Sequence, residues 1–252
     1  MRGDYQPVRF PGNLDDDAVQ RELDRLESSP DQLPVNAVNL RRFAGLLHTP
    51  ILELDRIVRC VERDPLLAVG VLRLVTDELD GIDPIRISDC IVIAGRTRLL
   101  ALAESKDFAL ASVPVLDNFA ERSRVCSLIA SRLAASTRAV DFAAARLAGL
   151  LHLLGELPIL LSGRAPDGYS PVEIAAWGKR LASSWRLPAV LISAIAAYDE
   201  RVCYGASDPM QLIIGATRRL VSCHVPEEAP PAAVLLGHEE RASETAKCQS
   251  LS

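Results

Sequence analysis

Two ionisable side chains lie in an otherwise apolar stretch near the middle of the chain, and they are the residues best placed to do chemistry. The stretch is DFAAARLAGLLHLLGELPILL, from Asp141 to Leu161, and it contains His152 and Glu156. Side chains four residues apart project from the same face of an α-helix. A histidine at such a position is either a catalytic or metal-ligating residue or a hydrogen-bonded residue of the core, and the second is the commoner case.

The element that must position this pair is a helix that is apolar on nearly all sides. Asp141 is a suitable N-cap, Ala and Leu fill the next turns, and only Arg146 and Glu156 interrupt the apolar run. A helix of this kind belongs in the middle of a bundle rather than on its surface. Gly155 and Pro158 are expected to bend or end it.

The remainder of the chain predicts helix after helix. Start signals occur at Asn36, at Asp64 with proline next, and at Ser170, where Ser-Pro-Val-Glu is a capping box. Gly95 separates a short helix from the longer one that follows it. No segment shows the two-residue alternation of a strand over any length. We therefore predict an all-α protein, a multi-helix bundle with short connecting loops.

The composition argues against several classes of protein. Of the 252 residues 49% are hydrophobic, enough for a sizeable core, and the net charge of −5 lacks the basic excess of a nucleic-acid-binding protein. The six cysteines form no CxxC pair, which argues against a zinc site or a disulfide framework and favours reduced thiols in a cytosolic protein. We expect neither a signal peptide nor a membrane span, since no stretch reaches roughly 18 uncharged apolar residues.

The central stretch also carries a family resemblance. AGLLHLLGEL, from Ala148 to Leu157, resembles the signature helix of the HD phosphohydrolase superfamily, AGLLHDIGKL. In that superfamily the adjacent histidine and aspartate bind a divalent metal. Here the aspartate position is Leu153, and an aliphatic side chain offers no lone pair to a cation. The resemblance therefore implies a cleft that has lost its metal site.

Further blocks resemble the HDOD domain, the non-hydrolytic relative of that superfamily. In the family's order they are Leu33-Pro34, Glu62–Val75, Gly81–Gly95 and Gly168–Glu200. A histidine sometimes found in the family's long helix is replaced by Arg122, and arginine does not ligate metal at physiological pH. The family's C-terminal Tyr-His-His is Tyr198-Asp199-Glu200 here. With these ligand positions altered, we expect neither a metal nor any other cofactor.

The resemblance also implies the domain organisation. An HDOD domain would span residues 33–224, after a tail and a short helix in residues 1–32 and before a C-terminal tail in residues 225–252. Within the domain we expect an N-terminal helical subdomain over residues 33–110 and an HD-like helical subdomain over residues 116–222.

For function, the resemblance implies a cytoplasmic bacterial signal-transduction module that is not an enzyme and that acts by protein–protein interaction. Its partner would be a cyclic-nucleotide signalling enzyme, a kinase or another regulator, and we expect no nucleic acid and no membrane. In this hypothesis Arg122 pairs with Glu156, and their partly buried salt bridge fills the space of the former metal. Removing one partner of such a bridge would strongly destabilise the protein.

Two alternatives use the same cleft differently. A sensor of a small ligand such as a nucleotide would line it with His152, Glu156, Arg122 and Arg96. A residual metal-dependent phosphohydrolase would instead need a site rebuilt from histidine and acidic residues. That site would combine His152, Asp199 and Glu200, although adjacent acids at a helix end are usually solvated.

A basic turn offers a further candidate contact. Arg96 and Arg98 flank Thr97 at a predicted helix start. They could contact an anionic ligand such as a nucleotide phosphate, or they form a solvated turn. Positive charge at a helix N-terminus does not stabilise the helix.

Overall fold

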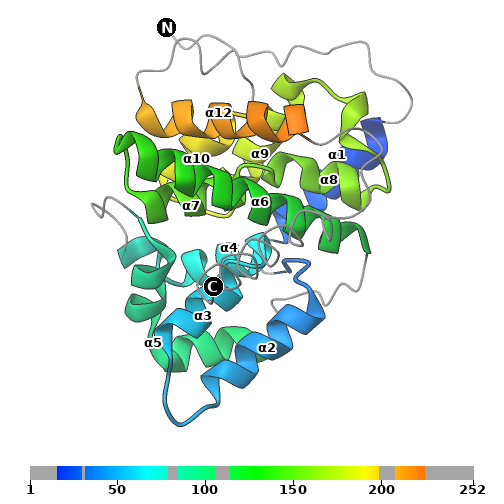
Figure 1. Ribbon diagram of the computed structural model, residues 1–252. Helices are drawn as coiled ribbons and strands as arrows, with labels where there is room; N and C mark the ends of the chain where they lie inside the picture. Colours follow the sequence, from blue (N-terminus) through cyan, green and yellow to red (C-terminus); the bar gives the residue numbers. More distant parts are fainter. Residues whose placement is uncertain (1–15, 30–31, 79–84, 106–113, 199–207, 225–252) are drawn as a thin grey trace, which may run out of the picture.

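The computed structural model describes residues 16–29, 32–78, 85–105, 114–198 and 208–224, and these residues are helical with no β-strand (Figure 1). The all-α prediction is therefore confirmed. The helices are α1 (Asp16–Ser28), α2 (Ala37–Leu47), α3 (Leu54–Val61), α4 (Pro65–Leu74), α5 (Ile87–Glu104), α6 (Pro114–Thr137), α7 (Phe142–Leu151), α8 (Leu157–Leu161), α9 (Pro171–Ser184), α10 (Ala189–Ala196) and α12 (Pro209–His224), with 3₁₀ turns η1 (Thr76–Glu78), η2 (Leu154–Glu156) and η3 (Pro166–Gly168).

The predicted start signals act as helix caps. The side chains of Asn36, Asp64 and Asp141 each accept hydrogen bonds from two backbone amides at the start of the helix that follows. Ser170 and Glu173 form the expected reciprocal capping box at the start of α9. Each cap satisfies amides that have no partner inside the helix, which is typically worth about 1 kcal/mol.

The helices form two halves that lie one above the other in Figure 1, with α2 to α5 in the lower half and α6 to α12 in the upper half. Helix α1 precedes the lower half in sequence but packs on α8 and α9 of the upper half. The fully buried indole of Trp185 donates a hydrogen bond to the carbonyl oxygen of Leu26 at 3.2 Å. Arg180 also pairs with Glu27 at 2.7 Å. The short helix expected within residues 1–32 is thus part of the upper half.

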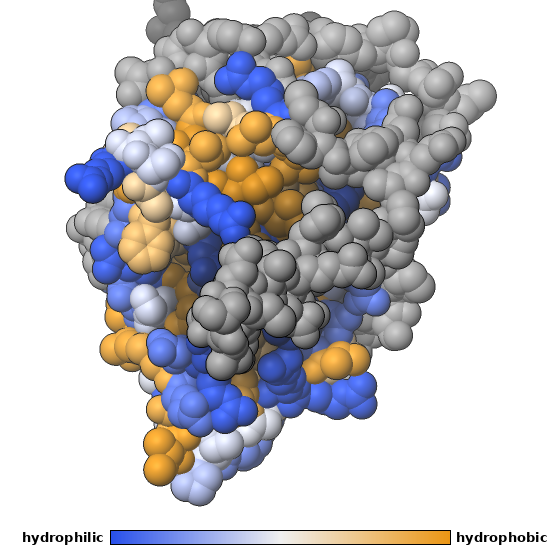
Figure 2. Space-filling view, viewed as in Figure 1, coloured by the Kyte–Doolittle hydropathy of each residue, from blue (hydrophilic) through white to orange (hydrophobic). Residues whose placement is uncertain are grey.

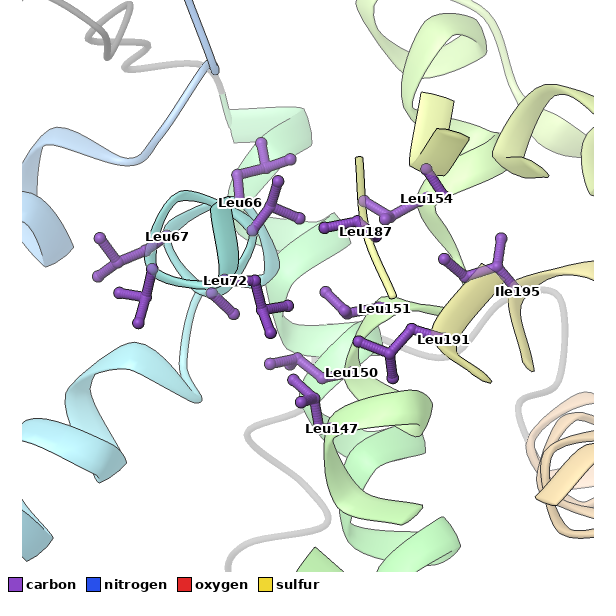
Figure 3. Packing of buried hydrophobic residues seen from close by; sticks show 14 of the residues in the cluster. Leu66, Leu67, Leu72, Leu147, Leu150, Leu151, Leu154, Leu187, Leu191 and Ile195 are labelled. Atoms are coloured by element: carbon purple, nitrogen blue, oxygen red, sulfur yellow. The ribbon is translucent and has the colours of Figure 1, made fainter. Parts of the chain in front are cut away.

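Leucines join the two halves into one core. Figure 3 shows side chains of α4, such as Leu66 and Leu72, lying opposite those of α7 and α10, such as Leu151 and Leu191. Each of these four side chains is at most 2% exposed. Burial of a leucine side chain is worth about 1.5–3 kcal/mol. Helix α7, which ends just before His152, packs mainly against α6 and shares this apolar core.

The central helix is interrupted near Gly155 and Pro158, as expected, but it ends a turn earlier than Gly155. Helix α7 ends at Leu151, the η2 turn follows, and Pro158 lies in the first turn of the short α8. The segment Phe142–Leu161 is long and apolar enough to cross a membrane, yet 89% of its most apolar window is buried inside the fold. It is therefore the core segment of the bundle, as the sequence predicted.

Gly155 allows η2 to pack closely against α9. An added Cβ at Gly155 would collide with the carbonyl group of Ile174 in α9, and Gly178 lies in the same contact. Only a residue without a side chain allows η2 to approach α9 this closely. Gly95 has a different role, because its φ of 68° produces the predicted break within α5.

We predict that Gly155→Ala lowers the free energy of unfolding by about 3 kcal/mol, because the backbone of α9 must move to accept a methyl group. The matched control is Gly45→Ala in α2, where an added Cβ meets nothing within 4 Å. Alanine is the better helix former, so that change should raise stability by up to about 1 kcal/mol. Urea denaturation of both variants measures the difference, and equal effects would refute this packing assignment.

Candidate functional site

The residues singled out around the HD-like motif line a pocket of about 240 Å³ in the upper half of the molecule. Its walls come from α6, from the end of α7 with η2, from the start of α9, from the residues after α10 and from α12. Figure 1 shows α6 and α12 side by side on this part of the fold. The lining includes Arg122, His152, Leu153, Glu156, Tyr198 and Arg218.

Glu156 is the centre of the polar part of this pocket. Its side chain is only 2% exposed, and both of its carboxylate oxygens accept hydrogen bonds. Arg122 of α6 donates to Oε2 at 2.5 Å, and the hydroxyl of Tyr198 donates to Oε1 at 2.8 Å. The predicted pairing of Arg122 with Glu156 is confirmed. Because both oxygens are engaged, this carboxylate is held as part of the fold.

Tyr198 and Arg218 are site residues that the sequence did not reveal. Burial raises the pKa of Tyr198, as does the neighbouring Glu156, so its hydroxyl stays protonated and remains a donor. The guanidinium carbon of Arg218 lies 3.7 Å from the centre of the Tyr198 ring, a cation–π contact, and Arg218 also donates to the Tyr198 carbonyl oxygen. Tyr198 closes a block that resembles the family, but no local signal distinguished Arg218.

His152 is fully buried and neutral. Its Nδ1 lies 2.8 Å from the carbonyl oxygen of Gly149, which can only accept, so Nδ1 carries the proton. Burial lowers the pKa of His152 to about 4, and the positive charges of Arg218 and Arg122 act in the same direction. Nε2 is then a bare acceptor, and it has no hydrogen-bond partner among the described residues.

The other predicted site residues do not all join this pocket. Leu153 lines it and is 5% exposed. Arg98 lies on the second half of α5 and pairs with Glu78 at 2.7 Å, while the neighbouring Arg96 is exposed. Neither arginine lines the pocket, and an anion contact there stays a prediction. Asp199 and Glu200 lie outside the described residues.

The donors present do not fit a divalent metal. Glu156 is occupied by two donors, Leu153 contributes no lone pair, and two arginines place positive charge beside His152. Burial raises the pKa of the Cys126 thiol in the same pocket to about 12, so it is protonated and a poor ligand. In the part of the chain that the structure describes, no three histidine, cysteine or acidic side chains are grouped to hold a metal.

Comparison with known families matches residues 33–172 to the HDOD domain, a span that contains His152, Leu153 and Glu156. The chain belongs to the HDOD domain family. The match covers the lower half and the α6–α7 core, so Leu153 and the neighbouring pocket residues His152 and Glu156 lie inside this HDOD domain.

Solved structures resemble the same fold. A crystal structure of the MmoQ response regulator from Methylococcus capsulatus has a TM-score of 0.59 and 15% sequence identity, over 79% of this chain and 90% of that chain. A fragment of MmoQ, residues 20–298, has a TM-score of 0.49 and 16% identity, over 79% and 93% of the respective chains. No curated protein matches the chain.

The buried histidine predicts a pH dependence of stability. A histidine with a pKa of about 4 when folded and about 6.5 when unfolded binds more protons in the unfolded chain between these values. Stability should therefore fall as the pH drops from about 6.5 towards 4, by about 3 kcal/mol from this group. His152→Gln removes the titrating group and should flatten the curve of unfolding free energy against pH over this interval.

His48 supplies the control, because it is an exposed histidine that pairs with Glu104 at 3.1 Å. His48→Gln should leave the slope between about pH 6.5 and 4 unchanged, since no buried group is removed. Urea unfolding across this interval measures both variants. An unchanged slope in His152→Gln would contradict a buried, neutral His152.

Proposed function

We propose that this HDOD chain is a non-catalytic regulatory module that acts by binding a protein partner. The proposal is based on the side chains that line the HD-like cleft. Where the superfamily places a metal-binding aspartate this chain has Leu153, and the remaining carboxylate, Glu156, is engaged by Arg122 and Tyr198. Metal-dependent hydrolysis needs a cation to activate water and to stabilise the developing charge, and these donors do not supply its ligands.

A regulatory role is supported by the family and by the similar solved protein, which is a response regulator. The expected partner is a cyclic-nucleotide signalling enzyme, a kinase or another regulator, and the expected location is the cytoplasm. The turn before α3 offers contact surface, since Ile51, Leu52 and Leu54 are exposed by 79%, 38% and 39%. Apolar side chains grouped at a surface are typical of sites that contact other proteins.

The first test is metal content together with hydrolysis. Protein purified from cells supplied with manganese and iron should contain far less than one metal ion per chain. Activity on a cyclic dinucleotide should equal that of the His152→Ala variant, because neither protein can hold the cation. Stoichiometric metal together with hydrolysis that His152→Ala abolishes would contradict the proposal.

The second arm tests partner binding in the native host. Cross-linking should recover an identified signalling protein, whose binding is then measured with purified components. Ile51→Asp should weaken that binding at least tenfold, because a charge replaces an apolar contact. The control is Val92→Asp on α5, at a residue that is 65% exposed, and it should have no effect. Equal weakening by both changes would contradict a contact surface at this turn.

A second candidate function rests on the free Nε2 of His152. A buried acceptor without a partner beside a pocket of about 240 Å³ is suited to a small ligand with a hydrogen-bond donor. The pocket is smaller than the roughly 300–1,000 Å³ of typical ligand sites, so a fragment of a nucleotide fits better than a dinucleotide. Arg122 and Arg218 are balanced there by Glu156 and Asp167, so a strongly anionic ligand gains little.

Thermal unfolding in the presence of nucleosides and mononucleotides tests this candidate. Binding at the cleft should raise the melting temperature of the unaltered protein, because a ligand that binds the folded state stabilises it. His152→Phe keeps a ring but removes the acceptor, so the rise should disappear. Absence of any shift, or an equal shift in His152→Phe, would remove the candidate.

A further inference from the structure

A second pocket, in the lower half of the molecule, is lined mainly by arginines. It lies between α2 and α3, has a volume of about 130 Å³, and is lined by Arg42, Leu46, Arg56, Arg59, Cys60 and Arg63. Figure 2 shows mostly hydrophilic residues on the lower part of the surface, where α2 lies in Figure 1. The pocket belongs to a different half from the HD-like cleft, so a ligand bound here would be independent of the function proposed for that cleft.

The arginines come from two helices and converge on one space. Arg56 and Arg59 lie three residues apart on α3, and Arg63 follows four residues later, just beyond the end of the helix. This spacing places neighbouring side chains on the same side of a helix, where like charges destabilise it. Arg42 approaches from α2. The repulsion between such like charges is small for each pair, and an anion bound between them would remove it.

Among the residues that the structure describes, no carboxylate lines the pocket. Arg56 contacts Glu53 at 2.9 Å, but both side chains are more than half exposed, and such pairs contribute little. Glu62 is also close to Arg59, but it is bridged to Arg146 at 2.9 Å. Within the described part of the chain, Arg42, Arg59 and Arg63 form no ion pair.

The remaining polar group of the pocket cannot neutralise this charge. Burial raises the pKa of the Cys60 thiol, so the thiol is protonated and uncharged at neutral pH. Among the described residues the pocket therefore presents several guanidinium groups and no anion. This concentration of positive charge occurs in a chain whose net charge is −5. No described residue that lines the pocket supplies a counter-ion for these groups.

The size of the pocket and its hydrogen-bond donors indicate which kind of anion would fit. A pocket of about 130 Å³ is well below the roughly 300–1,000 Å³ of typical ligand sites, so it suits one tetrahedral oxyanion better than a whole nucleotide. Guanidinium groups donate paired hydrogen bonds that match the oxygens of phosphate. We propose that the pocket between α2 and α3 binds a single phosphate group, carried either by free phosphate or by a phosphorylated side chain of a partner protein.

Calorimetric titration of the full chain tests this site and distinguishes the two sources. The probes are inorganic phosphate, a short phosphoserine peptide and the same peptide without phosphate, with sodium chloride matching the ionic strength. Binding of inorganic phosphate or of the phosphopeptide is expected, and the unphosphorylated peptide should not bind. Tighter binding of the phosphopeptide would assign the source to a partner protein, and tighter binding of inorganic phosphate would assign it to the free ion.

Arg42→Gln should weaken phosphate binding about tenfold, because one charge-assisted hydrogen-bond donor is lost. Arg41→Gln is the matched control, since Arg41 is the exposed neighbour on α2 that does not line the pocket. It removes the same charge and should change binding less than twofold. Both side chains are exposed, and circular dichroism verifies that the variants fold. Equal loss in the two variants, or no phosphate binding by the unaltered protein, would overturn the proposal.

Discussion

Glu156 is a carboxylate with almost no access to water, and the surrounding helices are arranged to neutralise it. Removing an ionised carboxylate from water costs several kcal/mol unless opposite charge and hydrogen bonds compensate. Arg122 supplies the charge from α6, and Tyr198 supplies a hydroxyl from the residues after α10. Arg218 of α12 then holds Tyr198 through its ring and carbonyl group. One buried charge thereby links η2 to three other elements.

The same arrangement determines the chemistry of the cleft. A carboxylate whose two oxygens are already engaged is a poor metal ligand, and two guanidinium groups oppose the approach of a cation. His152 is also engaged within the fold, because burial keeps it neutral and its Nδ1–H donates a hydrogen bond to the carbonyl oxygen of Gly149. Among the described residues the cleft therefore has the chemistry of a structural polar cluster, in which Nε2 of His152 accepts no hydrogen bond.

Local signals in the sequence predicted much of this structure. Caps at Asn36, Asp64 and Ser170 and the break at Gly95 depend on residues close in sequence, and all were confirmed. An interruption of the central helix at Gly155 and Pro158 was expected, but its exact end at Leu151 and the close approach of η2 to the distant backbone of α9 were not predicted.

Within the site, the Arg122–Glu156 pair was predictable only because the family resemblance aligned two distant positions. Tyr198 and Arg218 were missed for a physical reason. Their contacts arise from the packing of α10 and α12 against α6 and α7; Tyr198 keeps the tyrosine of the family's motif, but nothing near it in sequence shows that its hydroxyl meets Glu156, and Arg218 has no local signal. The pocket at Arg42 was also not predicted from the sequence, because Arg42 meets the arginines of α3 only in the folded protein.

A double-mutant cycle of unfolding free energies tests the central claim, that Arg122 compensates the buried charge of Glu156. Arg122→Met alone should destabilise the protein by about 3 kcal/mol, because the carboxylate stays buried without its cation. Glu156→Gln should recover at least about 1 kcal/mol of this loss when it is combined with Arg122→Met. A coupling energy near zero, with the two losses simply additive, would contradict the account.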